Sequence, residues 1–145
     1  MLQYIVYIFM NTKVQNHTSL GAKTILLIED DRDLATLLGN ALKEAGLEVL
    51  HADDGALGLS LALKHHPDLI LLDIVLPTMD GLVVLEKLRE DTWGKDASVI
   101  ILTNLSNEER VSAAIEGGVY EYLTKENWKM EDVVAKVKQR LGSGQ

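Results

Sequence analysis

Four apolar segments of this chain each end on polar residues that suit phosphate chemistry. The residues that end them are Glu29 with Asp30, then Asp73, Thr103 and Lys125. Carboxylates bind divalent cations and act as nucleophiles, whereas a hydroxyl or an ammonium can hold phosphoryl oxygens. If folding brings the four segment ends together, these residues predict a site for phosphoryl transfer.

The elements that position these residues alternate between strand and helix from Lys23 onward. Apolar runs predict strands, and apolar residues repeating at three and four positions predict helices between them. We predict strands at 24–29, 47–51, 68–73, 98–103 and 119–124, and helices over about 33–45, 56–66, 81–89, 106–116 and 130–141. Two residues are predicted helix caps: Asp80 for the third helix, and Ser106, through the pattern S-x-x-E, for the fourth.

The composition of the strands predicts their order in the sheet. The runs that start at Ile25, Leu69 and Val99 are continuously apolar, as in central parallel strands covered on both faces, whereas Glu48 and Glu121 interrupt the second and fifth strands, as edge strands allow. With right-handed crossovers, the fold class is α/β, a doubly wound five-stranded parallel sheet of order 2-1-3-4-5, flavodoxin-like. Ligands of such sheets bind beyond the carboxyl ends of the strands, so the polar residues should meet there.

Three carboxylates would then lie close together. Glu29, Asp30 and Asp73 would repel one another by roughly 4 kcal/mol per pair at about 4 Å and an effective dielectric of 20. Mg²⁺ relieves this repulsion because it prefers oxygen ligands. Asp73 is the predicted nucleophile, since an aspartate carboxylate can form an acyl phosphate. Asp31 and Asp33 stand where a helix N-terminus attracts anions, so at least one should be a cap, and neither is assigned to the metal.

Composition narrows the class of protein. The chain has 145 residues, of which 47% are hydrophobic, which suits one folded domain at 23–141 with a short tail at 142–145. Its formal net charge of -8 argues against direct nucleic-acid binding, which needs clustered Lys and Arg. It has no cysteine, which excludes disulfides and thiol chemistry and is compatible with a cytoplasmic location.

Residues 1–22 form a predicted extension outside the domain. Its first ten residues are strongly apolar but too few to span a membrane, which takes roughly 20. They also lack the basic start and small-residue cleavage site of a secretory signal. Two interpretations stay open: an over-extended reading frame with the true start at Met10, or an interfacial anchor.

Several of these residues resemble the motifs of a known family. The acidic tripeptide that starts at Glu29, the run Asp-Ile-Val-Leu-Pro-Thr-Met-Asp-Gly that starts at Asp73, and then Thr103, Tyr122 and Lys125 are similar to the receiver domain of response regulators in two-component signalling. Thr103 follows Asp73 by 30 residues and Lys125 follows Thr103 by 22, as in the chemotaxis member of the family. The resemblance covers about residues 23–141 and is closest to the stand-alone, single-domain type.

The resemblance implies a role for each residue. Asp73 would accept a phosphoryl group from a sensor histidine kinase, while Thr103 and Lys125 bind that group. Mg²⁺ would be held by Glu29, Asp30, Asp73 and the backbone carbonyl of Val75. Thr103 and Tyr122 would form the switch, although Tyr122 alone could also be simple edge-strand packing.

The resemblance also implies how the protein acts. It would be a signalling switch, not an enzyme, and would bind an unknown output protein through the face formed by residues 106–116, 119–124 and 130–141. A phosphorelay intermediate that passes phosphate to a histidine phosphotransfer protein would have the same site and stays open. An aspartate-nucleophile hydrolase would need an acid where Val75 stands, and an FMN carrier would need hydroxyls where Glu29 and its neighbours would repel phosphate.

The chain departs from the family at informative places. Glu126 follows Lys125 where the family has proline, so we expect a trans peptide there and ask whether Lys125 still reaches the site. Asn104 replaces a small residue and could contact the phosphoryl group or narrow access to it. Val75 and Leu105 are apolar where a polar side chain could orient a water, which predicts slow self-dephosphorylation.

Overall fold

The computed structural model describes residues 21–104 and 107–142, and these form one parallel sheet with helices on both faces. The strands are β1 (Thr24–Ile28), β2 (Glu48–Ala52), β3 (Leu69–Leu72), β4 (Val99–Thr103) and β5 (Glu121–Thr124), and their order β2-β1-β3-β4-β5 confirms the predicted fold class. The helices are α2 (Arg32–Glu44), α3 (Gly55–His65), α4 (Gly81–Glu90), α5 (Glu108–Glu116) and α6 (Met130–Gly142), with 3-10 turns η1 (Gly94–Asp96) and η2 (Lys125–Asn127).

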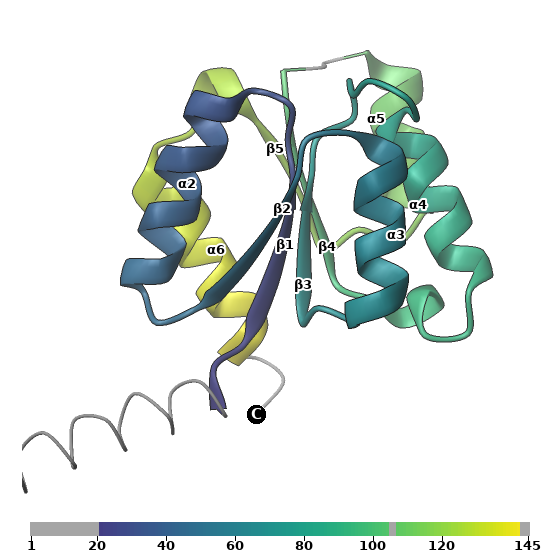
Figure 1. Cartoon of the computed structure of the whole chain (residues 1–145). Coiled ribbons are helices and arrows are strands. Elements are labelled where there is room, and N and C mark those ends of the chain that lie inside the picture. Colours follow the sequence, from purple (N-terminus) through teal and green to yellow (C-terminus); the bar gives the residue numbers. More distant parts are fainter. Residues whose placement is uncertain (1–20, 105–106, 143–145) are drawn as a thin grey trace, which may run out of the picture.

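The helices divide into two layers (Figure 1). Helices α2 and α6 cover one face of the sheet, and α3, α4 and α5 cover the other. Each layer has its own apolar core, because side chains of β1, β3 and β4 point alternately to the two faces. Every residue of β3 and β4 is buried, as their continuously apolar sequences predict.

Helix α3 lies unusually close to its neighbours. A Cβ at Gly58 would lie 2.6 Å from Ile28 Cδ1 on β1, and one at Gly55 would lie 1.9 Å from the Met79 carbonyl oxygen. Only glycine permits these approaches, so small residues face the sheet while Leu63 is 37% exposed. The glycines that weaken this helix in isolation are therefore required by its packing.

Side-chain caps start the helices that surround the sheet. Asp31 accepts the Leu34 N–H at 3.1 Å, so Asp31 rather than Asp33 is the cap of α2. Asp80 caps α4, as predicted. For α5 the residue predicted as the cap, Ser106, lies outside the described part of the chain, and the cap is Asn107, one position later. Its amide oxygen is one atom longer in reach than a serine hydroxyl and accepts two N–H groups of the first turn.

Three predictions concern residues outside the described part of the chain. They are the extension at 1–22, of which only residues 21 and 22 are described, the apolar side chain of Leu105, and the capping serine at 106. Among the helices that the structure describes, none has the length and apolar character needed to cross a membrane.

Candidate functional site

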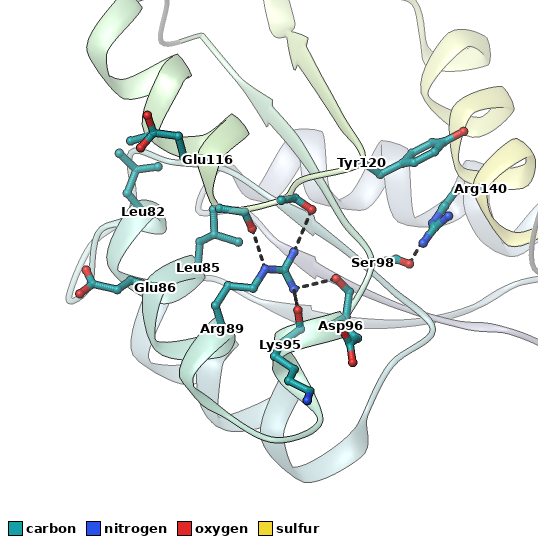
Figure 2. Close-up of a pocket in the computed structure, with 14 residues that line it drawn as sticks. Leu82, Leu85, Glu86, Arg89, Lys95, Asp96, Ser98, Glu116, Tyr120 and Arg140 are labelled. Carbon is teal, nitrogen blue, oxygen red and sulfur yellow. Dashed lines mark hydrogen bonds between the residues drawn. The ribbon is translucent and has the colours of Figure 1, made fainter.

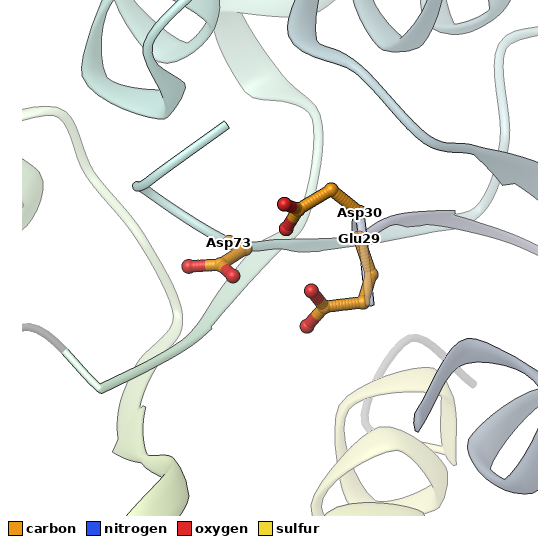
Figure 3. A group of neighbouring side chains, drawn as sticks. All are labelled: Glu29, Asp30 and Asp73. Atoms are coloured by element: carbon orange, nitrogen blue, oxygen red, sulfur yellow. The ribbon is translucent and has the colours of Figure 1, made fainter. Parts of the chain in front are cut away.

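The carboxyl ends of β1 and β3 bring three predicted residues together (Figure 3). Carboxylate oxygens of Glu29, Asp30 and Asp73 lie within 4.8 Å of one another, and we call these residues the acid cluster. Glu29 and Asp73 are buried, at 2% and 6% exposed, while Asp30 is exposed. The cluster thus has two carboxylates within the fold and one facing solvent.

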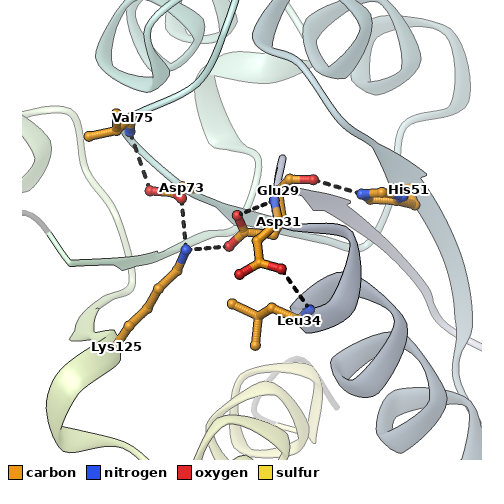
Figure 4. Close-up of polar contacts among 7 residues, drawn as sticks. All are labelled: Glu29, Asp31, Leu34, His51, Asp73, Val75 and Lys125. Atoms are coloured by element: carbon orange, nitrogen blue, oxygen red, sulfur yellow. Dashed lines mark hydrogen bonds and ion pairs between the residues drawn. The ribbon is translucent and has the colours of Figure 1, made fainter.

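Lys125 reaches the acid cluster from the end of β5 (Figure 4). Its Nζ lies 2.8 Å from Asp73 Oδ2 and 2.5 Å from Glu29 Oε1. Lys125 opens the turn η2, and the described part of the chain contains no cis peptide bond, so the Lys125–Glu126 bond is trans as expected. The ammonium therefore contacts the cluster without the family's proline.

The pKa values of this ion pair show how the charges are balanced. Burial raises the pKa of Glu29 to about 7, and the nearby charge of Asp73 adds to that effect, while hydrogen bonds from Lys125 and the Asp31 N–H oppose it. Burial alone would lower the pKa of Lys125, but its hydrogen bonds to Asp73 and Glu29 raise it above the ordinary value. Lys125 is stabilised by two carboxylates, whereas Glu29 shares one ammonium, so the site still favours a further cation.

Backbone groups orient the carboxylates. The N–H of Asp31 donates to Glu29 Oε2 at 3.1 Å, and the N–H of Val75 donates to Asp73 Oδ1 at 3.3 Å. Nε2 of His51 lies 2.8 Å from the Glu29 carbonyl oxygen and must carry the hydrogen, because a carbonyl only accepts. His51 is exposed, and its ring holds the backbone of the residue that follows β1.

Thr103 ends β4, and Tyr122 lies on the neighbouring strand β5, in register with Ile101. Thr103 is fully buried as the last residue of β4, and Tyr122 is partly buried on β5, where it packs against the core under α3, α4 and α5. Burial raises the pKa of Tyr122, the charge of Arg110 opposes this, and the charge of Asp73 adds to it. Tyr122 thus lies within electrostatic reach of both Arg110 and Asp73.

The segment after Asp73 contains contacts that sequence reasoning missed. Thr78 has φ +64°, a left-handed conformation that is rare for a β-branched residue and costs about 1–3 kcal/mol. Its hydroxyl donates to Asp54 Oδ1 at 2.9 Å and accepts the Ala56 N–H at 3.2 Å. The pair Asp54-Gly55 before an apolar repeat marks a cap in the sequence, but its tertiary partner is not marked.

A cavity of about 880 Å³ lies near the amino ends of β4 and β5, between α4, η1 and the turn after α5 (Figure 2). The guanidinium of Arg89 donates to the carbonyl oxygens of residues 94, 95, 97, 117 and 118. Arg140 donates to Ser98 Oγ and lies over the Tyr120 ring. Since these cations already serve structural contacts, the acid cluster is the better candidate site.

The fold and the acid cluster with its lysine together define a receiver domain. The family model described as the response regulator receiver domain matches residues 25–138, and the chain therefore belongs to this family. Receiver domains are the signalling switches of two-component response regulators, so the predicted class of protein is confirmed.

Individual relatives are similar over the same region. The DNA-binding dual master transcriptional regulator RpaA of Synechocystis is 38% identical over 117 residues, which cover 81% of this chain and 48% of that protein. The transcriptional regulatory protein PrrA of Mycobacterium tuberculosis is 35% identical over 124 residues, covering 86% and 52%. The chain thus spans about half the length of these curated relatives.

A solved structure also shares the fold. The CheY-like receiver domain protein of Methanospirillum hungatei has a TM-score of 0.78 at 27% identity, covering 84% of this chain and 95% of that one. The Mn²⁺-bound form of the response regulator Rcp1 has a TM-score of 0.69 at 32% identity, covering 81% and 90%.

Proposed function

We propose that this protein is a phosphorylation-activated response regulator whose domain at 23–141 accepts a phosphoryl group on Asp73 from a sensor histidine kinase. The single observation that carries the proposal is the contact of Lys125 Nζ with Asp73 Oδ2 at 2.8 Å, inside a cluster of three acids. It supports a nucleophile that is oriented and next to a cation.

The acid cluster fits Mg²⁺. Glu29, Asp30 and Asp73 offer carboxylate oxygens within 4.8 Å of one another, and Mg²⁺ binds few carboxylates together with waters and phosphate. The family resemblance adds the carbonyl of Val75. The Mn²⁺-bound form of Rcp1 supports a divalent cation in this fold. When bound, Mg²⁺ would take up negative charge on the transferred phosphoryl group.

The residues of the chain would do the rest by positioning. One carboxylate oxygen of Asp73 forms a bond to phosphorus as the bond from phosphorus to the donor's histidine nitrogen breaks, and that nitrogen keeps the electron pair. Lys125 holds a phosphoryl oxygen, and the N–H of Val75 orients the Asp73 carboxylate. Phosphoryl transfer depends mainly on such positioning and charge stabilisation.

The switch would pass from Asp73 to the outer surface. The hydroxyl of Thr103 would bind the phosphoryl group, and Tyr122 would move into the space that it leaves. This movement would remodel the face formed by α5, β5 and α6, to which an output protein binds. The names of RpaA and PrrA support a regulatory output, although our chain spans only half of such proteins.

We place the protein in the cytoplasm, where histidine kinases present their phosphoryl groups.

A phosphorelay intermediate remains the alternative, because its site would be the same. Transfer of radiolabelled phosphate from this chain to a histidine phosphotransfer protein of the same cell would favour the relay, and a stable phosphoprotein in that mixture would favour the terminal switch.

Phosphorylation by a small donor tests the proposal. With Mg²⁺ and acetyl phosphate, mass spectrometry should show one added phosphoryl group, and Asp73→Asn should abolish it while circular dichroism shows an intact fold. Asp33→Asn, an exposed acid in the first turn of α2, is the matched control and should still be phosphorylated. Undiminished uptake by Asp73→Asn would contradict the assignment.

A further inference from the structure

The segment that precedes α4, residues 75–80, is tied to helices on both of its sides, and we call it the strap. On the side of α3, the hydroxyl of Thr78 donates to Asp54 Oδ1 at 2.9 Å. On the side of α5, the carboxylate of Asp80 forms an ion pair with Arg110. The strap therefore connects the backbone that follows Asp73 to α5, which is part of the proposed output face.

The carboxylate of Asp80 has two separate tasks. Its Oδ1 accepts the Leu82 N–H at 2.9 Å and so caps α4, while its Oδ2 contacts Nη2 of Arg110. Arg110 lies in the first turn of α5, and the side chains of the pair are 37% and 35% exposed. One carboxylate thus begins one helix and holds the first turn of another.

Asp80 is also held firmly to the backbone of Asp73. The N–H of Gly81 donates to the Ile74 carbonyl oxygen at 2.7 Å, and a Cβ at Gly81 would lie 2.3 Å from the Asp73 carbonyl oxygen. Ile74 is fully buried. Because these contacts pack the backbone of Gly81 tightly against that of Asp73 and Ile74, a displacement of Asp73 would also move Asp80.

On its other side, Arg110 lies near the predicted switch residue. Burial raises the pKa of Tyr122, and the positive charge of Arg110 opposes that rise, which places the guanidinium within electrostatic reach of the phenol. Arg110 therefore contacts the strap through Asp80 and lies near Tyr122 on β5.

We propose that the Asp80–Arg110 ion pair is the link through which the state of Asp73 sets the position of α5. The inference rests on the proposed function. The Asp80–Arg110 pair is formed in the conformation in which Asp73 carries no phosphoryl group and its carboxylate contacts Lys125. It therefore stabilises that conformation, and its loss shifts the equilibrium toward the one that a phosphoryl group favours.

The affinity for beryllofluoride, a mimic of the phosphoryl group, measures this shift. Arg110→Met removes the charge, and Asp80→Asn removes it while keeping an oxygen to cap α4. With Mg²⁺ present, fluorine NMR titration should show that both variants bind beryllofluoride about two- to fivefold more tightly than wild type, the range expected from a partly exposed ion pair. Arg110→Lys keeps the charge and should restore wild-type affinity.

A second ion pair of similar exposure serves as the control. Lys136 Nζ lies 3.3 Å from Glu121 Oε2, and the side chains are 40% and 35% exposed. Lys136→Met should leave the affinity for beryllofluoride unchanged. In addition, amide exchange in residues 107–116 should be faster in Arg110→Met without beryllofluoride than in wild type, because the first turn of α5 has lost its anchor.

The outcomes separate this inference from the proposed function. If wild type binds beryllofluoride and Arg110→Met and Asp80→Asn bind it no more tightly, the link is wrong and the phosphate site stands. If wild type itself does not bind beryllofluoride in the presence of Mg²⁺, both the proposed function and the link fail. Equal tightening by Lys136→Met would also overturn the link, since any lost ion pair would then suffice.

Discussion

Lys125 Nζ lies 2.8 Å from Asp73 Oδ2, although 52 residues separate the two in sequence. The same ammonium contacts Glu29, so one cation offsets two buried carboxylates. Lys125 follows β5, which β4 and β3 separate from β1 in the sheet, so its side chain extends along the carboxyl ends of the strands to reach both acids.

Lys125→Met should slow phosphorylation by acetyl phosphate on the order of 10²-fold, the cost of removing one charged donor from a developing oxyanion. It should also lower the free energy of unfolding by about 3–5 kcal/mol without Mg²⁺, because the pair is largely buried and two carboxylates lose their partner. Rates come from mass spectrometry and stability from urea unfolding. Lys129→Met, at a nearby exposed lysine, should change neither quantity.

Asp30→Asn should weaken Mg²⁺ binding and leave the metal-free fold no less stable than wild type. Asp30 is exposed within the acid cluster, so its charge repels its neighbours without holding the fold together. Thermal melts with and without Mg²⁺ measure both effects. A variant that melted lower without metal and kept the wild-type shift with Mg²⁺ would show that Asp30 is structural.

The raised pKa of Glu29, about 7, predicts a pH dependence of the metal-free protein. Between its ordinary value of 4.5 and about 7, the folded state binds a proton that the unfolded chain has released, so this contribution to stability is lost as pH rises through the window. In EDTA, wild type should lose more stability between about pH 5 and about pH 8 than Glu29→Gln. Urea unfolding at both pH values checks this, and parallel curves would refute it.

Thr103→Ala should uncouple phosphorylation from the surface change without preventing phosphorylation. Thr103 is buried at the end of β4, so its hydroxyl can respond to the phosphoryl group while the nucleophile stays in place. A ligand shifts an equilibrium only by its difference in affinity for the two states, and the threonine would supply part of that difference. Amide exchange of residues 107–124 with and without beryllofluoride should respond in wild type and not in the variant.

Val75→Asn should shorten the lifetime of the phosphorylated protein. Val75 is 59% exposed beside Asp73, where an amide could orient an attacking water by hydrogen bonding. The decay of phosphoprotein after removal of the donor gives the rate. Val83→Asn on α4, where the valine is 38% exposed, is the control and should decay as wild type does. If Val75→Asn decays no faster, access past Asn104 is the better explanation of the lifetime.

The sequence by itself determined the elements and the edge of the sheet where the site lies. Continuous apolar runs distinguish buried central strands from charged edge strands, and the carboxyl ends of parallel strands share one edge. These are local patterns, so Glu29, Asp73 and Thr103 could be assigned to one site before any contact was known. Asp80 was equally visible as a cap, since capping depends on the next few residues.

Only the tertiary structure decided which distant groups meet. The reach of Lys125 depends on the path of η2, and the ion pair of Asp80 with Arg110 depends on how α5 packs beside α4. The left-handed φ of Thr78 arises because Asp54 and its neighbours hold the hydroxyl. Such contacts join residues that no sequence period relates, and their energies depend on burial that exists only after packing.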